Sequence, residues 1–480
     1  MSRTPLALAL LVATASPATA ASVRWVASTE TSRWQERAVT EAPAAEPDLE
    51  LLPARFQRVE GFGGCFNEYG WQALSWLGEA ERQVVLSQIF DPQDGLRFNF
   101  CRVPMGANDY ALEWYSLNET EDDFAMKDFS IARDERILIP YVKAAMAIRP
   151  DLALFASPWS PPTWMKRPRS YNYGRMRQEK AVLDAYALYF AKFVRAYGAH
   201  GIKVEQVHVQ NEPDSDQKFP SSVWSGAELR DFIKDHLGPL FAREGLSTEI
   251  WLGTIERADV NGWTHVVLGD PAARAYVKGV GFQWAGKGAI QRVRESFPDL
   301  PLMQTENECG DGQNTWDYAL YVASLMKHYF MNGVSRYLYW NMVLPAGGES
   351  TWGWKQNSMV TIDPKTKAIS WQPEFYVMKH LTRFVSPGAR VVGVTRFWAA
   401  NAIAFENPDG ERVVFVTNPW KEPRALTIGD GPARVSVTLD ARSFNTLTWR
   451  GQILNLESVH DQQESRVRQQ AIRFMHQFKT

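Results

Sequence analysis

The sequence predicts an α/β fold: a (β/α)8 TIM barrel with an attached β-sandwich domain formed from both chain ends. Between residues 56 and 385, short apolar runs alternate with amphipathic helical stretches in eight strand–helix units. After Pro387-Gly388 the helical pattern gives way to short strands separated by turns. Alternating strands and helices are typical of a parallel barrel, and a series of short strands is typical of a sandwich.

The expected barrel strands are short and largely apolar. They cover residues 59–61, 98–103, 152–157, 204–210, 249–253, 277–284, 302–306 and 336–341. Apolar residues at helical spacing predict helices between and after them. Examples are residues 79–89, 137–148, 182–197, 227–243, 318–331 and 375–384.

The expected sandwich strands cover residues 391–394, 402–406, 413–417, 425–428, 435–439 and 446–449, with a strong turn signal at Asn407-Pro408-Asp409-Gly410. An alternating stretch at 23–29 has no neighbour in the barrel pattern, so we expect it to join the sandwich. Residues 39–53 are rich in Ala, Pro and Glu and are interpreted as a linker. The predicted division is a signal peptide (1–20), an N-terminal strand and linker (21–55), the barrel (56–385), the sandwich (386–450) and a polar tail (451–480).

Composition and the N-terminus restrict the class of protein. The 480-residue chain has a net charge of −2, which gives no electrostatic basis for binding nucleic acid or an anionic membrane. Arg3, the apolar run 6–12 and Ala18-Thr19-Ala20 form a secretory signal pattern too short to span a bilayer. We therefore expect an exported protein, secreted or periplasmic, with no integral membrane segment after signal removal. Its three cysteines are expected to be buried free thiols.

Two carboxylates follow predicted barrel strands. Glu212 lies in Asn211-Glu212-Pro213, where Pro213 ends the strand because it has no N–H to continue a ladder. Glu306 ends the strand 302–306, and Glu308 is its rival two residues later. The carboxyl ends of barrel strands are where catalytic residues lie, and a pair of carboxylates there is what retaining glycosidase chemistry requires. A capping or ion-pairing role is the structural alternative for each.

Several segments together resemble glycoside hydrolase family 30, the glucosylceramidase family. The resemblance runs in order from about residue 55 to 450, and although Asn-Glu-Pro alone recurs in several barrel families, the combined set is specific. The segments are Gly61-Phe62-Gly63-Gly64, Arg102-Val103-Pro104-Met105-Gly106, Asp122-Asp123-Phe124, 156–166, Gln210-Asn211-Glu212-Pro213, 305–310 and Tyr339-Trp340-Asn341.

The resemblance implies a site, a reaction and a substrate class. It implies that Glu212 is the acid/base and Glu306 the nucleophile of a double displacement that cleaves β-glucosidic bonds, in a carbohydrate or glycolipid. No metal and no cofactor are needed for this chemistry. In one departure, Gln283-Trp284 stands where glucosylceramidases have a histidine before the aromatic residue. The implied substrate-binding residues are Asp109, Trp159, Asn211, Gln283, Trp284 and Trp340.

Other interpretations stay open from the sequence. An endo-acting β-1,6-glucanase or a xylanase of the same family fits the same carboxylates, because loops decide the substrate. A carbohydrate-binding protein without catalysis is the alternative from another class. Asp109 has an alternative role in a turn, and Trp159 and Trp340 have an alternative role in the core. His208, in mid-strand, is interpreted as a buried histidine with satisfied hydrogen bonds.

Overall fold

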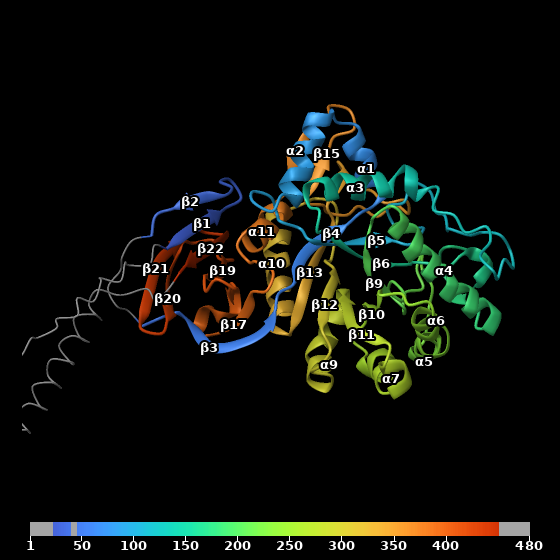
Figure 1. Ribbon diagram of the computed structural model, residues 1–480. Coiled ribbons are helices and arrows are strands. Elements are labelled where there is room, and N and C mark those ends of the chain that lie inside the picture. Colours follow the sequence, from blue (N-terminus) through green and yellow to red (C-terminus); the bar gives the residue numbers. More distant parts are fainter. Residues whose placement is uncertain (1–22, 40–45, 451–480) are drawn as a thin grey trace, which may run out of the picture.

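The computed structural model describes residues 23–39 and 46–450. The predicted signal peptide and the predicted polar tail lie outside these residues, so export and the role of the tail stay predictions. The described part consists of a barrel and a sandwich packed side by side, with helices α10 (Trp316–Met331) and α11 (Pro373–Thr382) between them (Figure 1).

The barrel is closed by eight parallel strands, as predicted. In spatial order β10, β11, β12, β13, β4, β5, β6 and β9 neighbour one another, and β9 closes the ring with β10. Their bounds are β4 Gly61–Cys65, β5 Phe100–Pro104, β6 Ala153–Ser157, β9 Val204–His208, β10 Glu249–Ile255, β11 Val277–Gln283, β12 Leu302–Glu306 and β13 Val334–Asn341.

Helices cover the outside of the barrel. The segment expected as one helix at 227–243 contains a central π-helical stretch, Phe232–Leu237. The other helices are α1 Glu68–Ser75, α2 Glu79–Phe90, α3 Leu138–Ile148, α4 Lys180–Ala199, α5 Gly226–Asp231, α6 Gly238–Arg243, α7 His265–Leu268, α8 Pro271–Arg274 and α9 Ile290–Ser296. Small sheets extend the loops: β7 Lys166–Arg167 with β8 Arg175–Met176, and β14 Val343–Pro345 with β15 Val360–Ile362 and β16 Ile369–Trp371.

The first barrel strand lies later in the chain than predicted. The expectation was 59–61, but β4 covers Gly61–Cys65. Its three glycines have low strand propensity, which hides the strand in the sequence pattern. Gly63 is required by close packing, because a Cβ there would lie 1.7 Å from the backbone oxygen of Phe100 on the next strand. A glycine in a strand here marks a close approach of two backbones.

The sandwich is formed from both chain ends, as predicted. Its nine strands are hydrogen-bonded in the order β2-β1-β22-β19-β18-β17-β3-β20-β21. Strand β1 pairs antiparallel with β22, and the indole N–H of Trp25 donates to Asn445 Oδ1 at 3.1 Å. The bounds are β1 Arg24–Ser28, β2 Gln35–Arg37, β3 Leu49–Arg58, β17 Arg390–Thr395, β18 Ala402–Glu406, β19 Arg412–Asn418, β20 Arg424–Asp430, β21 Ala433–Leu439 and β22 Ser443–Trp449.

The linker interpretation of 39–53 is wrong for its last part. Residues 49–53 begin β3, which pairs with β17 and β20 inside the sheet. Leu49 and Leu51 are buried in the sandwich core, while the strand's exposed residues include Leu52 and Phe56. The register of β3 against β17 shifts around Pro53, since a proline interrupts a ladder at a bulge. Residues 40–45 lie outside the described part.

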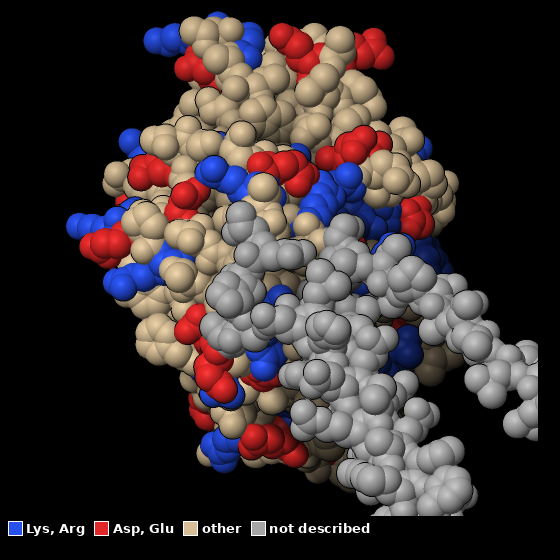
Figure 2. Space-filling view, turned by 90° about the vertical axis from the view of Figure 1, so that its left-hand side faces the viewer, with Lys and Arg blue, Asp and Glu red and all other residues tan. Residues whose placement is uncertain are grey.

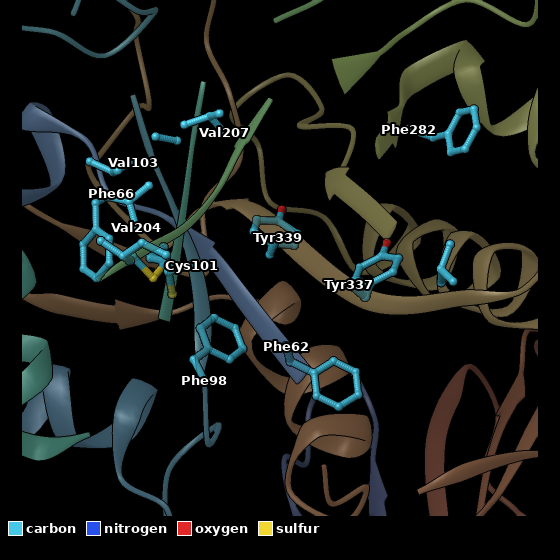
Figure 3. Close-up of a cluster of buried hydrophobic side chains, with 14 of the residues drawn as sticks. Phe62, Phe66, Phe98, Cys101, Val103, Val204, Val207, Phe282, Tyr337 and Tyr339 are labelled. Carbon is cyan, nitrogen blue, oxygen red and sulfur yellow. The ribbon is translucent and has the colours of Figure 1, made fainter. Parts of the chain in front are cut away.

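Alternation along the barrel strands separates two cores. Residues such as Cys101 and Val103 face the helices and belong to the large cluster of which Figure 3 shows members. Phe100 faces the barrel interior with Phe155, Trp251, Met303 and Leu338. Arg102 shares the parity of Phe100, so the strand's period of two directs its charged side chain into the barrel. All three cysteines are buried and free, as predicted.

The surface carries charges of both signs. On the visible part of the face in Figure 2, acidic and basic side chains are interspersed, which accords with the net charge of −2. Within the described residues, we find no helix with the length and apolarity needed to cross a membrane.

Replacing Gly63 by Ala is expected to lower the free energy of unfolding by about 1–3 kcal/mol or more, because the added methyl group would meet backbone that cannot rotate away. The denaturation midpoint in urea measures the change. The matched control is Gly198→Ala in α4, where a Cβ meets nothing within 4 Å. Its midpoint should stay or rise slightly, since alanine favours a helix more than glycine does. Equal midpoints for the two variants would contradict the packing argument.

Candidate active site

The carboxyl ends of the barrel strands surround one cavity of about 290 Å³. Glu306, the last residue of β12, and Glu212, which follows β9, both reach it. The other side chains that line it are Asp109, Trp159, Asn211, Ser215, Gln217, Phe219, Glu256, Arg257, Trp284, Ala285, Cys309, Trp340, Trp352, Trp354 and Gln356.

Glu306 is held by three donors. Arg102 Nη1 donates to Oε2 at 2.7 Å, and the indole N–H of Trp284 donates to Oε1 at 3.1 Å. Gln283 Nε2 lies 3.4 Å from Oε2. The side chain of Arg102 is fully buried, and its guanidinium lies 4.1 Å from the ring centre of Trp159. Such an ion pair in a buried site favours the ionised carboxylate.

Glu212 is held by neutral donors. Gln283 Nε2 donates to Oε1 and the Ser215 hydroxyl donates to Oε2, both at 2.9 Å. The backbone of Glu212 has a φ of 52°, in the left-handed region that non-glycine residues rarely occupy. Its N–H donates to the Thr254 oxygen at 3.1 Å, which fixes this turn. Strained backbone of this kind is concentrated at functional sites.

The two carboxyls differ in their charge environment. Burial raises the pKa of both Glu212 and Glu306, and the charge of Glu212 raises the pKa of Glu306 further, whereas Arg102 opposes the rise in each. Two close carboxyls of this kind do not both ionise readily. Of the two carboxyls, only that of Glu306 is hydrogen-bonded to Arg102. We therefore assign the negative charge to Glu306 and the proton to Glu212.

Two amide side chains are fixed in one orientation. Asn211 Oδ1 accepts from Arg102 Nη2 at 2.6 Å, from Thr254 Oγ1 at 3.0 Å and from Gln283 Nε2 at 3.2 Å. Its NH2 group is therefore the part left to face the cavity. Gln283 Oε1 accepts from the Thr305 hydroxyl at 2.9 Å, so its NH2 group points at both carboxyls.

Aromatic rings and the carboxyl of Asp109 form a further part of the cavity wall. The rings of Trp159 and Trp340 lie 5.5 Å apart at 35°. Asp109 Oδ1 accepts from the indole N–H of Trp352 at 2.6 Å. Burial raises the pKa of Asp109 to about 6. This wall offers flat apolar faces beside a hydrogen-bonding carboxyl, a combination suited to a polyol ring.

The structure brings most of the predicted site residues together. Asp109, Trp159, Asn211, Trp284 and Trp340 line the cavity with the two carboxyls. Gln283, predicted as a substrate contact, is fully buried and contacts the carboxyls instead.

Two other residues lie outside the cavity. Glu308 binds Lys287 at 2.6 Å and the Tyr321 hydroxyl at 2.7 Å. His208 lies inside the barrel against Phe155, as the buried-histidine interpretation requires. Its Nε2 lies 3.3 Å from Gln206 Oε1 and its Nδ1 has no partner among the described residues, so the expectation of satisfied hydrogen bonds is met at one ring nitrogen only. Burial lowers the pKa of His208 well below its usual value.

Sequence reasoning missed several residues of the site. Arg102 is recognisable in the sequence as a charged residue inside an apolar strand. Its partners cannot be identified from the sequence, because they lie far along the chain. Trp352 and Trp354 come from the loop between β14 and β15, which has no strand-end signature. Glu256 directly follows β10. In the sequence it stands next to Arg257, and this pattern alone does not distinguish a site residue from an ordinary surface ion pair.

No group of His, Cys, Asp and Glu within the described ranges has the arrangement of a metal site. The expectation of chemistry without a metal or cofactor stays a prediction.

Replacing Arg102 by Met is expected to lower the free energy of unfolding at pH 8 by about 3–5 kcal/mol, because the buried carboxyls lose their counter-charge. Both carboxyls have raised pKa values in the folded protein. The deficit should therefore shrink as the pH falls toward about 4, where they become neutral in both states. Urea denaturation at pH 8 and pH 5 measures this.

The matched control for Arg102 is Arg167→Met, which breaks an exposed pair with Glu179. It should change the free energy of unfolding by less than about 1 kcal/mol. A deficit in Arg102→Met that is equal at both pH values would contradict the charge assignment.

Comparison with known proteins adds an independent finding. A model of the glycosyl hydrolase family 30 TIM-barrel domain matches residues 59–385, and a model of the family 30 beta sandwich domain matches residues 388–447. The chain is 29% identical over 435 residues to the lysosomal acid glucosylceramidase of Mus musculus, and the match covers 84% of each chain. It is 25% identical over 418 residues to an endo-1,6-beta-D-glucanase of Neurospora crassa, and this match covers 82% of the chain and 85% of the relative.

A solved structure agrees with these matches. The crystal structure of SrfJ from Salmonella typhimurium superposes with a TM-score of 0.83 at 28% identity, covering 90% of this chain and 100% of the other. The alternative of a non-catalytic binding protein is not retained. The predicted family is confirmed: the chain belongs to glycoside hydrolase family 30, enzymes that hydrolyse glycosidic bonds.

Proposed function

We propose that the enzyme cleaves β-glucosidic bonds with retention of configuration, by double displacement at Glu306 and Glu212. The observation that carries this is the bridge made by Gln283, whose Nε2 is 2.9 Å from Glu212 Oε1 and 3.4 Å from Glu306 Oε2. The sum of these distances is an upper limit on the separation of the two oxygens. That limit allows the carboxyl separation of roughly 5–5.5 Å found in retaining enzymes.

In the first step, Glu306 attacks the anomeric carbon while Glu212 gives its proton to the leaving oxygen. Arg102 keeps Glu306 ionised, and burial keeps Glu212 protonated. A glycosyl–Glu306 ester forms and the bond to the leaving group breaks. The NH2 group of Asn211 is free to donate to the sugar 2-hydroxyl, a contact that strengthens in the transition state.

In the second step, Glu212 acts as a base toward water. Ester formation removes the negative charge of Glu306, which makes ionised Glu212 more favourable. Glu212 takes a proton from water, the water oxygen bonds to the anomeric carbon, and the Glu306 ester bond breaks. The catalytic pair returns to its starting protonation, and the product carries the β configuration.

The preference for glucose rests on the aromatic rings and the part of the cavity wall that carries Asp109. Asp109, Trp159 and Trp340 provide a hydrogen-bonding carboxyl and two apolar faces, and burial gives unpaired polar groups there a high cost. The relative from Mus musculus is a glucosylceramidase, and the relative from Neurospora crassa is an endo-1,6-beta-D-glucanase. Both names indicate enzymes that act on glucose-containing substrates. This supports a glucosyl subsite without fixing the leaving group.

An endo-acting β-1,6-glucanase is the second candidate. The cavity mouth carries an arc of rings in which Trp354 lies 5.8 Å from Trp284 and 5.4 Å from Trp352, and Phe219 lies 5.5 Å from Trp352. Rings of this kind suit a second sugar as well as an aryl or lipid group. A xylanase is the third candidate, and its substrate would lack the C5 hydroxymethyl group of glucose.

Glu306→Ala should lose essentially all turnover of 4-nitrophenyl β-glucoside, because the variant lacks the carboxylate that forms the glycosyl ester. Added azide should restore some activity and yield the α-glycosyl azide. The matched control is Glu308→Ala, which should lose much less. An inactive Glu308 variant beside an active Glu306 variant would reverse the assignment.

Glu212→Gln should cleave aryl glucosides with good leaving groups far better than alkyl glucosides, because a general acid matters most when the leaving group is poor. Azide should accelerate the variant and yield the β-glycosyl azide. The measurement is kcat/KM against leaving-group pKa. An equal loss on all substrates, without an azide effect, would count against an acid/base role.

The preferred substrate is tested by kcat/KM on 4-nitrophenyl β-glucoside, 4-nitrophenyl β-xyloside, a β-1,6-glucan and glucuronoxylan. Glucose-based substrates should be faster, because xylose lacks the C5 hydroxymethyl group and leaves the polar groups of the wall unpaired. The ratio of β-1,6-glucan to aryl glucoside separates endo from exo action. Faster turnover of xyloside or xylan than of every glucose-based substrate would overturn the proposed sugar but leave the catalytic pair intact.

A further inference from the structure

A third carboxyl reaches the catalytic cavity and has no part in the double displacement. Glu256 follows β10, lines the cavity beside Glu212 and is only 2% exposed. Unlike Glu306, it has no close cation. The nearest is Arg257, whose Nε lies 3.9 Å from Glu256 Oε1 and 3.5 Å from Asp214 Oδ2. A buried carboxylate so weakly paired is costly to ionise.

One hydroxyl joins Glu256 to the acid/base. Ser215 Oγ lies 2.9 Å from Glu212 Oε2 and 3.2 Å from Glu256 Oε1. A hydroxyl has a single hydrogen, so Ser215 donates to one carboxyl and must accept from the other for both contacts to be hydrogen bonds. Whichever carboxyl donates to Ser215 must carry a proton on the oxygen that faces it.

The remaining contacts of Glu256 give its ionised form little stabilisation. Its Oε1 accepts from the Asp214 N–H at 2.9 Å, and its Oε2 has no partner among the described residues. Burial and the charge of Glu212 raise the pKa of Glu256 to about 8, against the weaker opposing effect of Arg257. Arg102 and Arg257 oppose the rise in the pKa of Glu212, and the charge of Glu212 in turn raises the pKa values of Glu306, Asp109 and Glu256.

We propose that Glu256 is a positioning residue that stays protonated, donates to Ser215 and thereby directs the Ser215 hydroxyl to Glu212 Oε2. The inference rests on the proposed role of Glu212 as acid/base. With the Ser215 hydroxyl donating to Oε2, the proton of Glu212 is not held in that contact and is available on Oε1, which also accepts from Gln283 Nε2 on the side of Glu306. Nothing is consumed, since Glu256 keeps its proton through both steps.

Ionised Glu256 would reverse this arrangement. The Ser215 hydroxyl would then donate to the Glu256 carboxylate, and Glu212 would donate its proton from Oε2 to Ser215 Oγ. That proton would point away from the leaving group. The ionisation of Glu256 therefore switches the acid/base from a productive to an unproductive arrangement, and activity should fall as the pH rises through this ionisation.

The direction of a pH shift tests the proposal. Glu256→Gln keeps a neutral group that can donate to Ser215 but cannot ionise, so the alkaline limb of kcat/KM should move to higher pH. If Glu256 were simply an ionised neighbour that raises the pKa of Glu212, its removal would move this limb to lower pH. A lower or unchanged limb overturns the proposal.

A spectroscopic measurement and a second variant complete the test. The infrared band of a protonated carboxyl near neutral pH should weaken in Glu256→Gln, and Glu308→Gln is the matched control that should keep both the band and the limb. Ser215→Ala should lower kcat by about tenfold with little change in KM, below the roughly 10²–10⁴-fold effect of a general acid itself. Full kcat in Ser215→Ala with poor leaving groups overturns the proposal even if Glu256→Gln fails to fold.

The two proposals fail in different ways. If Glu212→Gln shows no dependence on the leaving group, the acid/base assignment fails. If Glu212→Gln behaves as an acid/base variant while Glu256→Gln leaves the alkaline limb unchanged, only the inference about Glu256 fails.

Discussion

The site depends on one buried guanidinium. Arg102 lies inside the barrel because its parity on β5 directs it there, and it binds Glu306, Asn211 and Ser157 while stacking on Trp159. A buried charge is tolerated only when its partners are paired and hydrogen-bonded. The cation therefore lets two buried carboxyls share one cavity and decides which of them carries the negative charge.

Much of this arrangement follows from local sequence. Glu212 and Glu306 could be placed because each stands where an apolar strand ends, and parallel strands end at the same rim. The pairing of Arg102 with Glu306 could not be derived this way, since 204 residues separate them. The partnership of Ser215 with Glu256 is likewise made by two loops that meet only in the folded barrel.

The misplaced elements share a physical cause. Strand β4 is rich in glycine, and β3 contains a proline and charged residues, so neither has the composition of a strand. Both form because neighbours supply what the composition lacks: β4 fits the tight space beside Phe100, and β3 is held between β17 and β20. Tertiary packing overrides local propensity most where strands are short or closely packed.

The pairing of β1 with β22 has a consequence for the order of folding. Trp25 and Asn445 are 420 positions apart, so the sandwich cannot close until nearly all of the described chain has been synthesised. The barrel strands, in contrast, all precede residue 342 and can assemble while the sandwich is incomplete. During that interval the apolar faces of β1 and β3 lack their partners, which makes them the segments most exposed to aggregation or to a holding chaperone.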